Sequence, residues 1–262
     1  MPDNLKITLI QSLLHWEDKQ ANFSMFDDKI DAVKEGTDII ILPEMFSTGF
    51  TMNAKAMAEP MNGPAVEWMK KKAREKNCAI TGSMIISENE AFFNRLIWMN
   101  PDGSLIQYDK RHLFRLAHEE QSFAPGKIKI IIDYKGWKIL PLICFDLRFP
   151  VWSRRTKSSD YDLLLYVANW PERRIAAWNQ LLIARAIENQ CYVAGLNRVG
   201  NDGNDIYHSG ESAVINCKGE NICGIPSHEE CTESITLNKQ ELNDFRKQLP
   251  FIEDSDDFTI KL

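Results

Sequence analysis

The sequence predicts a mixed α/β protein in which two layers of strands pack together and helices cover the outside. Continuous aliphatic runs such as DIIILPE at 38–44 and YDLLLYVANW at 161–170 are typical of strands that are buried on both faces. Amphipathic helical patterns occur between these runs. The sequence contains no G-x-G-x-x-G motif and no phosphate-binding loop, so a layered sandwich is favoured over a Rossmann fold.

The first half of the chain predicts a β-α-β opening followed by antiparallel strands. Helical periodicity predicts one helix over 17–35 and another over 64–76, and PDGS at 101–104 predicts a turn. The segments with strand composition in this half are LKITLIQS (5–12), DIIILPE (38–44), CAITGSMII (78–86), AFFNRLIWMN (91–100) and LIQYDK (105–110).

The second half predicts a hairpin over 127–143 that turns near Lys135 and Gly136, then a short helix after Pro150. Pro171 suits the first turn of a longer helix. The apolar residues expected on the inner face of that helix are Ile175, Trp178, Leu182 and Ile187. The remaining segments are strands over 161–170, 191–200 and 210–216, a last helix over 238–250, and an acidic tail.

Composition limits the classes of partner. The 262 residues, 44% of them hydrophobic, suffice for one globular domain over 1–262. A formal net charge of -6 argues against nucleic acid as the main partner, since phosphate binding relies on clustered Lys and Arg. No apolar run approaches the roughly 20 residues of a membrane span, and the amino terminus lacks a basic segment followed by an apolar one. We therefore expect a cytoplasmic protein that does not bind membranes.

The six cysteines are expected to be reduced thiols without a metal. The chain is long for a disulfide scaffold, and no C-x-x-C pair supports a closed zinc site. GNDGND at 200–205 lacks the glutamate of a calcium loop and predicts a tight turn. Neither a metal nor an organic cofactor is expected.

Three predicted strands end in polar residues: Glu44 after DIIILP, Lys110 after LIQYD and Cys144 after LPLI. The carboxyl ends of such strands are where open α/β sheets carry their sites. Each residue alone has a structural alternative. A lone cysteine is usually a small buried hydrophobe, a buried glutamate can form a salt bridge or cap a helix, and a lysine beside an arginine is usually surface.

Together the three residues suit hydrolysis of an amide. A thiol attacks a carboxamide as the thiolate, and a carboxylate in a dry pocket can accept its proton. Lys110 and the backbone N–H of Phe145, which follows the cysteine, could stabilise the oxyanion. Among the histidines, His112 is the nearest rival to Glu44 as the base.

In their order and setting, LPEMF, YDKRHLF and CFDLRFP resemble the Glu-Lys-Cys triad motifs of the nitrilase (carbon-nitrogen hydrolase) superfamily. The resemblance covers nearly the entire chain. The segments FSTGF, LPLICFDLRFPVWSR, ANWP and ARAIENQCYVAGLNRVG look closest to the omega-amidase branch, whose members hydrolyse 2-oxoglutaramate.

The resemblance implies a four-layer αββα sandwich, two mixed sheets flanked by helices, that forms at least a homodimer. The tail from about residue 250 would pack at the subunit interface. The resemblance also implies a second carboxylate between the lysine and cysteine motifs. Glu119 matches that position, Glu120 is adjacent, and a solvated loop is the alternative for this acidic pair. Phe145 stands where many relatives carry tyrosine, which removes a phenol but keeps the backbone N–H.

The function that follows is hydrolysis of the terminal amide of 2-oxoglutaramate, or of a similar small 2-oxo acid monoamide such as 2-oxosuccinamate, through a cysteine thioester. The substrate's distal carboxylate needs a cation, and Arg174 is the first candidate, before Arg173 and Arg148. Each of these arginines could instead form a structural ion pair. Phe50, Phe145 and Trp170 are expected to wall the pocket, although aromatic residues are often core.

Two groups of alternatives stay open. Within the superfamily, the chain could be an amidase or N-carbamoyl hydrolase for another small substrate. From other classes, it could be a non-catalytic dimeric binding protein on the same scaffold, or a redox protein that uses Cys144 as a sensor. The intact triad argues against a binding protein, and the absence of a resolving cysteine nearby in sequence argues against a sensor.

Overall fold

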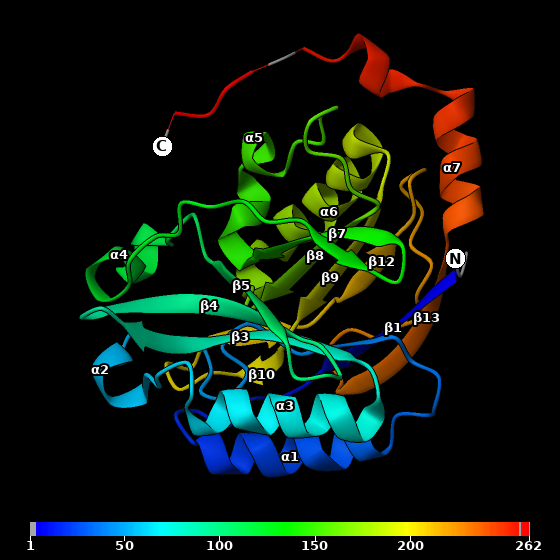
Figure 1. Ribbon diagram of the computed structural model, residues 1–262. Helices are drawn as coiled ribbons and strands as arrows, with labels where there is room; N and C mark the ends of the chain where they lie inside the picture. The colour runs from blue at the N-terminus through cyan, green and yellow to red at the C-terminus, as the bar shows by residue number, and fades with distance from the viewer. Residues whose placement is uncertain (1–3, 257, 262) are drawn as a thin grey trace.

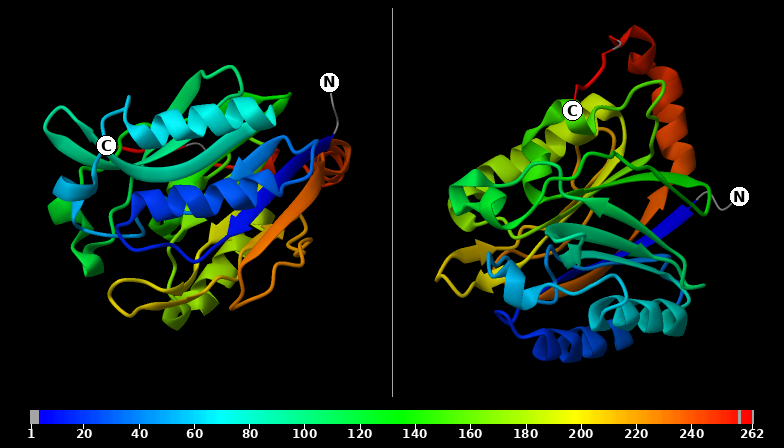
Figure 2. Two further views of the ribbon diagram at one scale, coloured as in Figure 1. Left: turned by 90° about the horizontal axis from the view of Figure 1, so that it is seen from below. Right: turned by 60° about the vertical axis from the view of Figure 1, so that its left-hand side comes forward.

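The computed structural model describes residues 4–256 and 258–261. Two sheets pack face to face, with helices on both outer faces, as Figure 1 and the two further views of Figure 2 show. One sheet has six strands in the order β13-β1-β2-β3-β4-β5, and the other has five in the order β12-β9-β8-β7-β6. The expected αββα class of two mixed sheets flanked by helices is confirmed.

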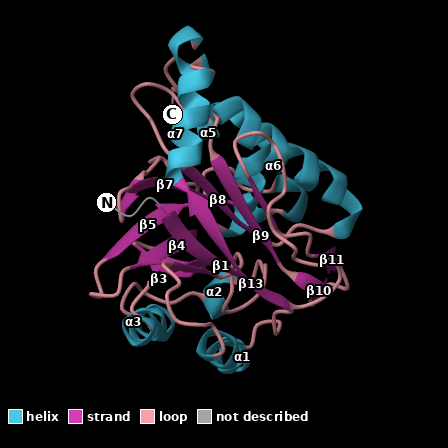
Figure 3. Cartoon of the chain, turned by 90° about the vertical axis from the view of Figure 1, so that its right-hand side faces the viewer, coloured by secondary structure: helices cyan, strands magenta, loops and turns pink. Residues whose placement is uncertain are grey.

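The six-stranded sheet is parallel at its centre and antiparallel towards its edges. Strands β1, β2 and β3 run parallel, whereas β13, β4 and β5 pair antiparallel with their neighbours. Its strands are β1 (Asn4–Gln11), β2 (Ile39–Ile41), β3 (Ala79–Glu88), β4 (Ala91–Met99), β5 (Leu105–Asp109) and β13 (Cys231–Asn238). On the outer face lie α1 (Lys19–Asp31) and α3 (Pro64–Lys76), which Figure 3 shows end-on.

The five-stranded sheet has a parallel centre of β7, β8 and β9 with antiparallel strands at both edges. Its strands are β6 (Ile132–Tyr134), β7 (Trp137–Ile143), β8 (Leu163–Ala168), β9 (Tyr192–Asn197) and β12 (Ala213–Ile215). Its outer face is covered by α5 (Pro150–Ser153) and α6 (Ile175–Asn189). The other elements are α2 (Ala54–Met57), α4 (Glu119–Ser122), the two-stranded β10 (Val199–Asn201) and β11 (Tyr207–Ser209), α7 (Lys239–Gln248), and 3-10 helices at Arg115–Ala117, Cys144–Arg148, Glu172–Arg174 and Phe251–Asp254.

Strand alternation divides the apolar side chains between two cores. In β2, Ile39 and Ile41 face the other sheet and join the inter-sheet core with Leu9 of β1. Ile40 points the opposite way, into the core under α1 and α3. Because successive side chains of a strand point to opposite faces, a continuous aliphatic run fills both cores at once. The aliphatic runs in the sequence therefore mark the strands of a layered sandwich.

The structure corrects two details of the predicted elements. The first helix is shorter than 17–35, because Asp18 caps it through a hydrogen bond from the Ala21 N–H and the helix ends at Asp31. Ile187 of α6 does not face inward: its side chain is 45% exposed. The inner face of that helix follows the four-residue spacing of Trp178, Leu182 and Ala186 instead.

Candidate active site

The three polar strand-end residues come from both sheets and meet between them. Glu44 follows β2 and Lys110 follows β5, both in the six-stranded sheet, while Cys144 follows β7 in the five-stranded sheet. The Lys110 Nζ lies 2.9 Å from Glu44 Oε1, and the side chains of both residues are fully buried. The sandwich therefore brings these two charged groups together at the end of its core, next to the thiol.

A second carboxylate binds the same lysine. Lys110 Nζ donates to both Glu119 oxygens, at 3.0 Å each, and the Phe114 N–H donates to Glu119 Oε2 at 2.6 Å. Glu119 opens the short helix α4 and is fully buried. Glu120, by contrast, keeps 27% of its side chain exposed and lies 4.0 Å from Arg115. In this geometry Glu119 is the residue of the acidic pair that contacts Lys110.

Both oxygens of Glu44 are held by donors. Oε1 accepts from Lys110 Nζ and from the Asn94 side-chain amide, each at 2.9 Å. Oε2 accepts from the backbone N–H of Asn169 at 2.8 Å, and the Asn169 side-chain amide donates to the Glu44 carbonyl at 2.6 Å. Asn169 directly follows β8, so the carboxylate from one sheet is fixed by a strand end of the other.

The electrostatics of the cluster favour a charged lysine and a neutral thiol. Burial alone would lower the pKa of Lys110, but the charges of Glu119 and Glu44 outweigh it and raise that pKa. Burial raises the pKa of Glu119, and the Glu44 charge adds to this against the opposing effect of Lys110. Burial, followed by the negative charge of Glu44, raises the pKa of the Cys144 thiol well above its usual value. The resting thiol therefore keeps its proton at neutral pH.

Cys144 sits in a left-handed backbone conformation, with φ of 43°. Non-glycine residues rarely adopt this region, and such strain persists where surrounding contacts hold it. Here the buried Asp146 supplies them, because it accepts from the Ile143 N–H at 3.1 Å and from the Tyr108 hydroxyl at 2.8 Å. At this residue the chain leaves β7 and enters the 3-10 helix Cys144–Arg148, so the cysteine lies at the strand end.

The rival base, His112, is engaged elsewhere. Its Nδ1 lies 2.7 Å from Asp146 Oδ1, and its ring stacks on Phe149 with centroids 3.8 Å apart. These contacts hold the imidazole against the turn after the cysteine. The geometry favours Glu44 as the partner of the thiol.

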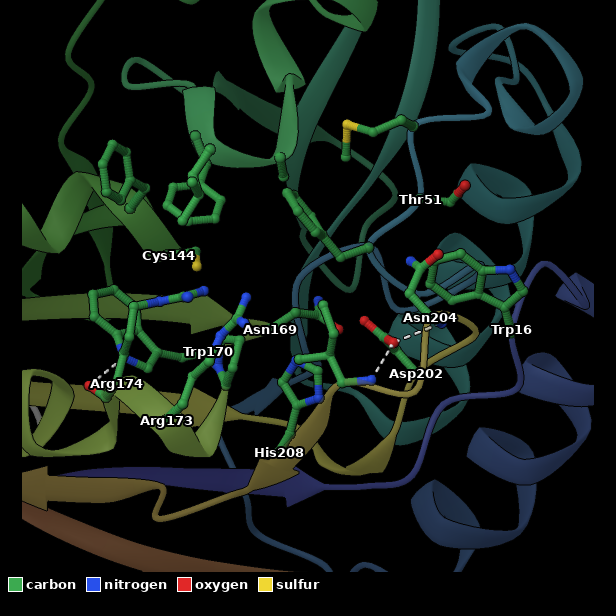
Figure 4. A pocket seen from close by; sticks show the side chains of 18 of the residues that line it. Trp16, Thr51, Cys144, Asn169, Trp170, Arg173, Arg174, Asp202, Asn204 and His208 are labelled. Atoms are coloured by element: carbon green, nitrogen blue, oxygen red, sulfur yellow. Dashed lines mark hydrogen bonds between the residues drawn. The ribbon is translucent and has the colours of Figure 1, made fainter.

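Cys144 and Lys110 open onto a cavity of about 560 Å³. All six residues expected to contact the substrate line it: Phe50, Phe145, Arg148, Trp170, Arg173 and Arg174. Trp16, Phe114 and Asn169 also contribute to the wall. Figure 4 shows Arg173, Arg174 and Trp170 on the same side as Cys144, and Trp16, Thr51 and Asp202 on the opposite side. The cavity therefore has a cationic side and a side that carries an acidic residue.

Two of the three arginines that line the cavity contact aromatic rings. The Arg148 guanidinium lies 4.8 Å from the Trp170 ring centre, and that of Arg174 lies 4.9 Å from the Phe114 ring centre. Burial lowers the pKa of Arg174, and the like charges of Arg173 and Arg148 lower it further. Within the described residues, the arginines in ion pairs with carboxylates are others: Arg95, Arg115, Arg154, Arg155, Arg185 and Arg246. Three cations thus face the cavity without a carboxylate partner, which suits an anionic ligand.

Two residues that contact Glu44 were not anticipated from the sequence. Asn94 interrupts an apolar run in β4, and a buried amide must find hydrogen-bond partners, so its position was a usable signal. Asn169 lies within ANWP, which carried the resemblance, but its bonds to Glu44 cross between the sheets and have no signature in the sequence.

Over residues 4–256 and 258–261, no group of three or more His, Cys, Asp or Glu side chains is arranged to hold a metal ion. Over the same residues, no helix combines the length and the apolar character needed to span a membrane. All six cysteines are free.

The sandwich and the cysteine site correspond to a family of known proteins. The chain belongs to the carbon-nitrogen hydrolase family, which it matches over residues 6–247. It is 45% identical to omega-amidase YafV of Escherichia coli strain K12, over 98% of both chains. It is 30% identical to the 2-oxoglutaramate amidase of Bacillus subtilis strain 168, over 95% of this chain and 96% of that protein.

Solved structures agree with the fold. XC1258 from Xanthomonas campestris, described as a CN-hydrolase superfamily protein with an arsenic adduct in the active site, superposes with a TM-score of 0.96 at 40% identity. The match covers 98% of this chain and 99% of that one. Saccharomyces cerevisiae Nit3, a nitrilase superfamily member, superposes with a TM-score of 0.85 at 23% identity, over 95% and 96% of the two chains. The family and the fold expected from the sequence are both confirmed.

Proposed function

We propose that this chain is an omega-amidase that hydrolyses the terminal amide of 2-oxoglutaramate, or of a similar 2-oxo acid monoamide such as 2-oxosuccinamate. The observation that carries the proposal is the buried cluster of Lys110 with Glu44 and Glu119, adjacent to Cys144 in a cavity with unpaired arginines. The similarity to an omega-amidase and to a 2-oxoglutaramate amidase over nearly the full chain supports the same substrate class.

In the first half-reaction, Glu44 accepts the Sγ proton of Cys144, and the sulfur attacks the carbon of the substrate amide. The negative charge that develops on the carbonyl oxygen is stabilised by Lys110 and by the backbone N–H of Phe145. Glu44 then gives the proton to the amide nitrogen, the carbon–nitrogen bond breaks, and ammonia leaves. The product is a thioester between Cys144 and the acyl group.

In the second half-reaction, Glu44 accepts a proton from a water molecule, whose oxygen attacks the thioester carbon. The same donors stabilise the second oxyanion, and the carbon–sulfur bond then breaks. Glu44 returns the proton to the departing sulfur, which restores the neutral thiol. One water is consumed, and the 2-oxo dicarboxylic acid is released.

The cluster suits this cycle because its charges are set before substrate binds. Burial and the Glu44 charge raise the pKa of the thiol, so the proton moves only when the attack on a bound carbonyl drives it. Lys110 keeps its positive charge because two carboxylates raise its pKa. Its Nζ also lies 5.1 Å from the Phe50 ring centre, so an aromatic residue of the cavity covers it.

The distal carboxylate of the substrate pairs with the cationic side of the cavity, with Arg174 as the principal contact and Arg173 and Arg148 beside it. Trp170 supports this side, because its ring lies under Arg148 and its Nε1–H donates to the Arg174 carbonyl at 2.9 Å. Phe145, packed on Phe114 at 5.0 Å between ring centres, forms an apolar wall.

Ammonia release measured with a panel of substrates tests the proposal. The panel contains 2-oxoglutaramate, glutamine, asparagine, a simple aliphatic amide, a carbamoyl amino acid and a nitrile, and Cys144→Ser is the control. We expect clear preference for 2-oxoglutaramate and loss of ammonia release in the variant. Activity only on the carbamoyl amino acid or another amide would keep the nucleophile and reject the substrate, and silence on every compound would favour a binding protein.

We also infer that two copies of the chain form a homodimer in which the tail from about residue 250 packs at the interface. Support comes from its apolar residues, since Leu249, Phe251 and Phe258 are 42%, 50% and 45% exposed. After α7 the chain arches back over the top of the molecule in Figure 1, where Glu253 lies 3.3 Å from Lys157 and Ile260 packs against the inter-sheet core. Three further predictions remain untested: that residues 1–262 form a single domain, that the reaction needs no cofactor, and that the protein is cytoplasmic. Cell fractionation tests the cytoplasmic location.

A further inference from the structure

Asn94 contacts every charged residue of the lysine cluster. Its side-chain Nδ2 donates to Glu44 Oε1 at 2.9 Å and lies 3.4 Å from Glu119 Oε1. Its backbone carbonyl accepts from the Lys110 N–H at 3.0 Å. The amide orientation follows from chemistry, because ionised carboxylates only accept hydrogen bonds and the NH₂ group must therefore face them.

The strand explains why a polar side chain at this position needs these partners. Asn94 is 1% exposed, and Leu96 and Trp98, which follow it on the same face of β4, belong to the inter-sheet core. An amide buried among such neighbours is costly unless it is hydrogen-bonded. The Nδ2 group of Asn94 faces the carboxylates of Glu44 and Glu119, so this buried amide is hydrogen-bonded to residues of the site.

The charge balance of the cluster shows what the amide contributes. One ammonium, that of Lys110, serves two fully buried carboxylates. The two carboxylates repel each other, and as a result the negative charge of Glu44 helps to raise the pKa of Glu119. A second cation would relieve the repulsion but would weaken Glu44 as a base. A neutral amide supplies a donor to each carboxylate and leaves the total charge unchanged.

We propose that Asn94 is a positioning residue that ties Glu44 to Glu119 and holds the general base oriented towards Cys144. The inference rests on the proposed function, since it assigns Asn94 to the proton transfers of Glu44. It concerns catalysis more than substrate binding, because Asn94 is not among the residues that line the cavity.

Removing the amide of Asn94 is expected to lower kcat. In Asn94→Ala, Glu44 keeps the bonds from Lys110 and Asn169 and loses the third. With one donor fewer, the orientation of Glu44 is less well fixed, so its proton transfers slow while the substrate contacts in the cavity stay in place. We expect kcat at neutral pH to fall about 10- to 100-fold with little change in KM.

The experiment measures kcat and KM for the wild type, Asn94→Ala and Asn94→Leu, on the panel amide that the wild type hydrolyses best. Ile97→Ala is the matched control: Ile97 lies on the other face of β4, under the outer helices, and its truncation lowers stability without touching the site. Thermal unfolding of all four proteins shows that they are folded. We expect kcat to fall with little change in KM in both Asn94 variants, and both constants to stay near the wild-type values in Ile97→Ala.

The outcomes separate the two proposals. Wild-type protein that releases no ammonia from any amide overturns the proposed function and this inference with it. An active wild type with an unchanged kcat in the Asn94 variants, or a rise in KM alone, overturns the inference and leaves the proposed function standing. If Asn94→Ala does not fold, Asn94→Leu decides the question, because leucine has nearly the shape of asparagine and carries no amide.

Discussion

Cys144 is chemically restrained in the resting protein. Its backbone φ of 43° places it at the start of a tight turn, and burial together with the Glu44 charge raises the pKa of its thiol. Many cysteine enzymes lower the pKa of the nucleophile in order to accumulate thiolate. Here the raised pKa keeps the thiol neutral, and in the proposed mechanism Glu44 accepts its proton when a substrate carbonyl is in place.

This restraint predicts the pH dependence of alkylation. With iodoacetamide we expect slow modification of Cys144 at neutral pH and a rate that is still rising at about pH 8.5, the usual thiol pKa. The sign follows from the raised pKa, because the thiolate fraction grows only at higher pH. Mass spectrometry of the modified peptide measures the rate, with Cys144→Ser as the blank. A plateau already reached near neutral pH would show that the thiolate dominates at rest.

Replacing Arg174 should affect substrates with a distal carboxylate more than neutral amides. Arg174→Ala should raise KM for 2-oxoglutaramate about 10- to 100-fold, because a charge-assisted bond to the distal carboxylate is lost. Hydrolysis of a neutral aliphatic amide should be nearly unchanged. Arg154→Ala is the control, since Arg154 pairs at 3.8 Å with Glu188 away from the cavity. Steady-state kinetics on both amides decide, and equal loss on both would remove the carboxylate contact.

The strand-end positions of Glu44, Lys110 and Cys144 were accessible from sequence, whereas the hydrogen bonds around them were not. Glu44, Lys110 and Cys144 each place a polar group just after a strand, and this change from apolar to polar residues can be read from the sequence. The bonds from Asn94 and Asn169 to Glu44 join residues 50 and 125 positions apart along the chain. Such partners are fixed by how the sheets stack, and no local pattern encodes this.

At the scale of elements, the turn after β7 is locked to the end of β5. Asp146 lies in that turn and is fully buried, and it accepts from Tyr108 of β5 and from the backbone N–H of His112 just beyond it. The Tyr108 hydroxyl also accepts from Trp152 Nε1 at 3.0 Å. The two segments that carry Lys110 and Cys144 therefore share one buried carboxylate as their link.

Breaking this link should affect stability and activity together. Asp146→Ala leaves its donors unpaired, which we expect to lower the free energy of unfolding by about 2–4 kcal/mol and to reduce kcat. Asp133→Ala, on the exposed side of β6, should change stability by less than about 0.5 kcal/mol. Urea unfolding and kinetics test both variants. A destabilised Asp146→Ala with unchanged kcat would mean that the link does not position the site.

Elements with strong end signals were predicted well. The helix over 64–76 begins at a proline in its first turn and ends at Asn77, which adopts the left-handed conformation. The inner face of α6 was predicted less well, because it includes polar residues: Arg185 is buried there and donates to the Leu147 carbonyl at 2.6 Å. The prediction counted only apolar residues as inward-facing, so it placed Ile187 on the buried face of the helix.

At the scale of the molecule, the exposed apolar residues after α7 predict association. Light scattering on the eluting protein should give the mass of a dimer or a larger even assembly. A chain that ends at Pro250 removes Phe251 and Phe258 and should dissociate at a higher concentration than the full chain. Phe251→Ser in the full chain is the milder variant. A full-length monomer, or equal association of the truncated chain, would contradict the inferred role of the tail.

The placement of nucleophile and base on different sheets has a consequence for how the protein tolerates change. The spacing between them is set by the thickness of the apolar layer that separates the sheets, to which Leu9, Ile39 and Leu142 contribute. A methyl group lost from that layer can alter the reaction rate although it lies far from any polar atom. Activity therefore depends on how tightly the two sheets pack. We expect it to decline in mild denaturant before the sandwich unfolds.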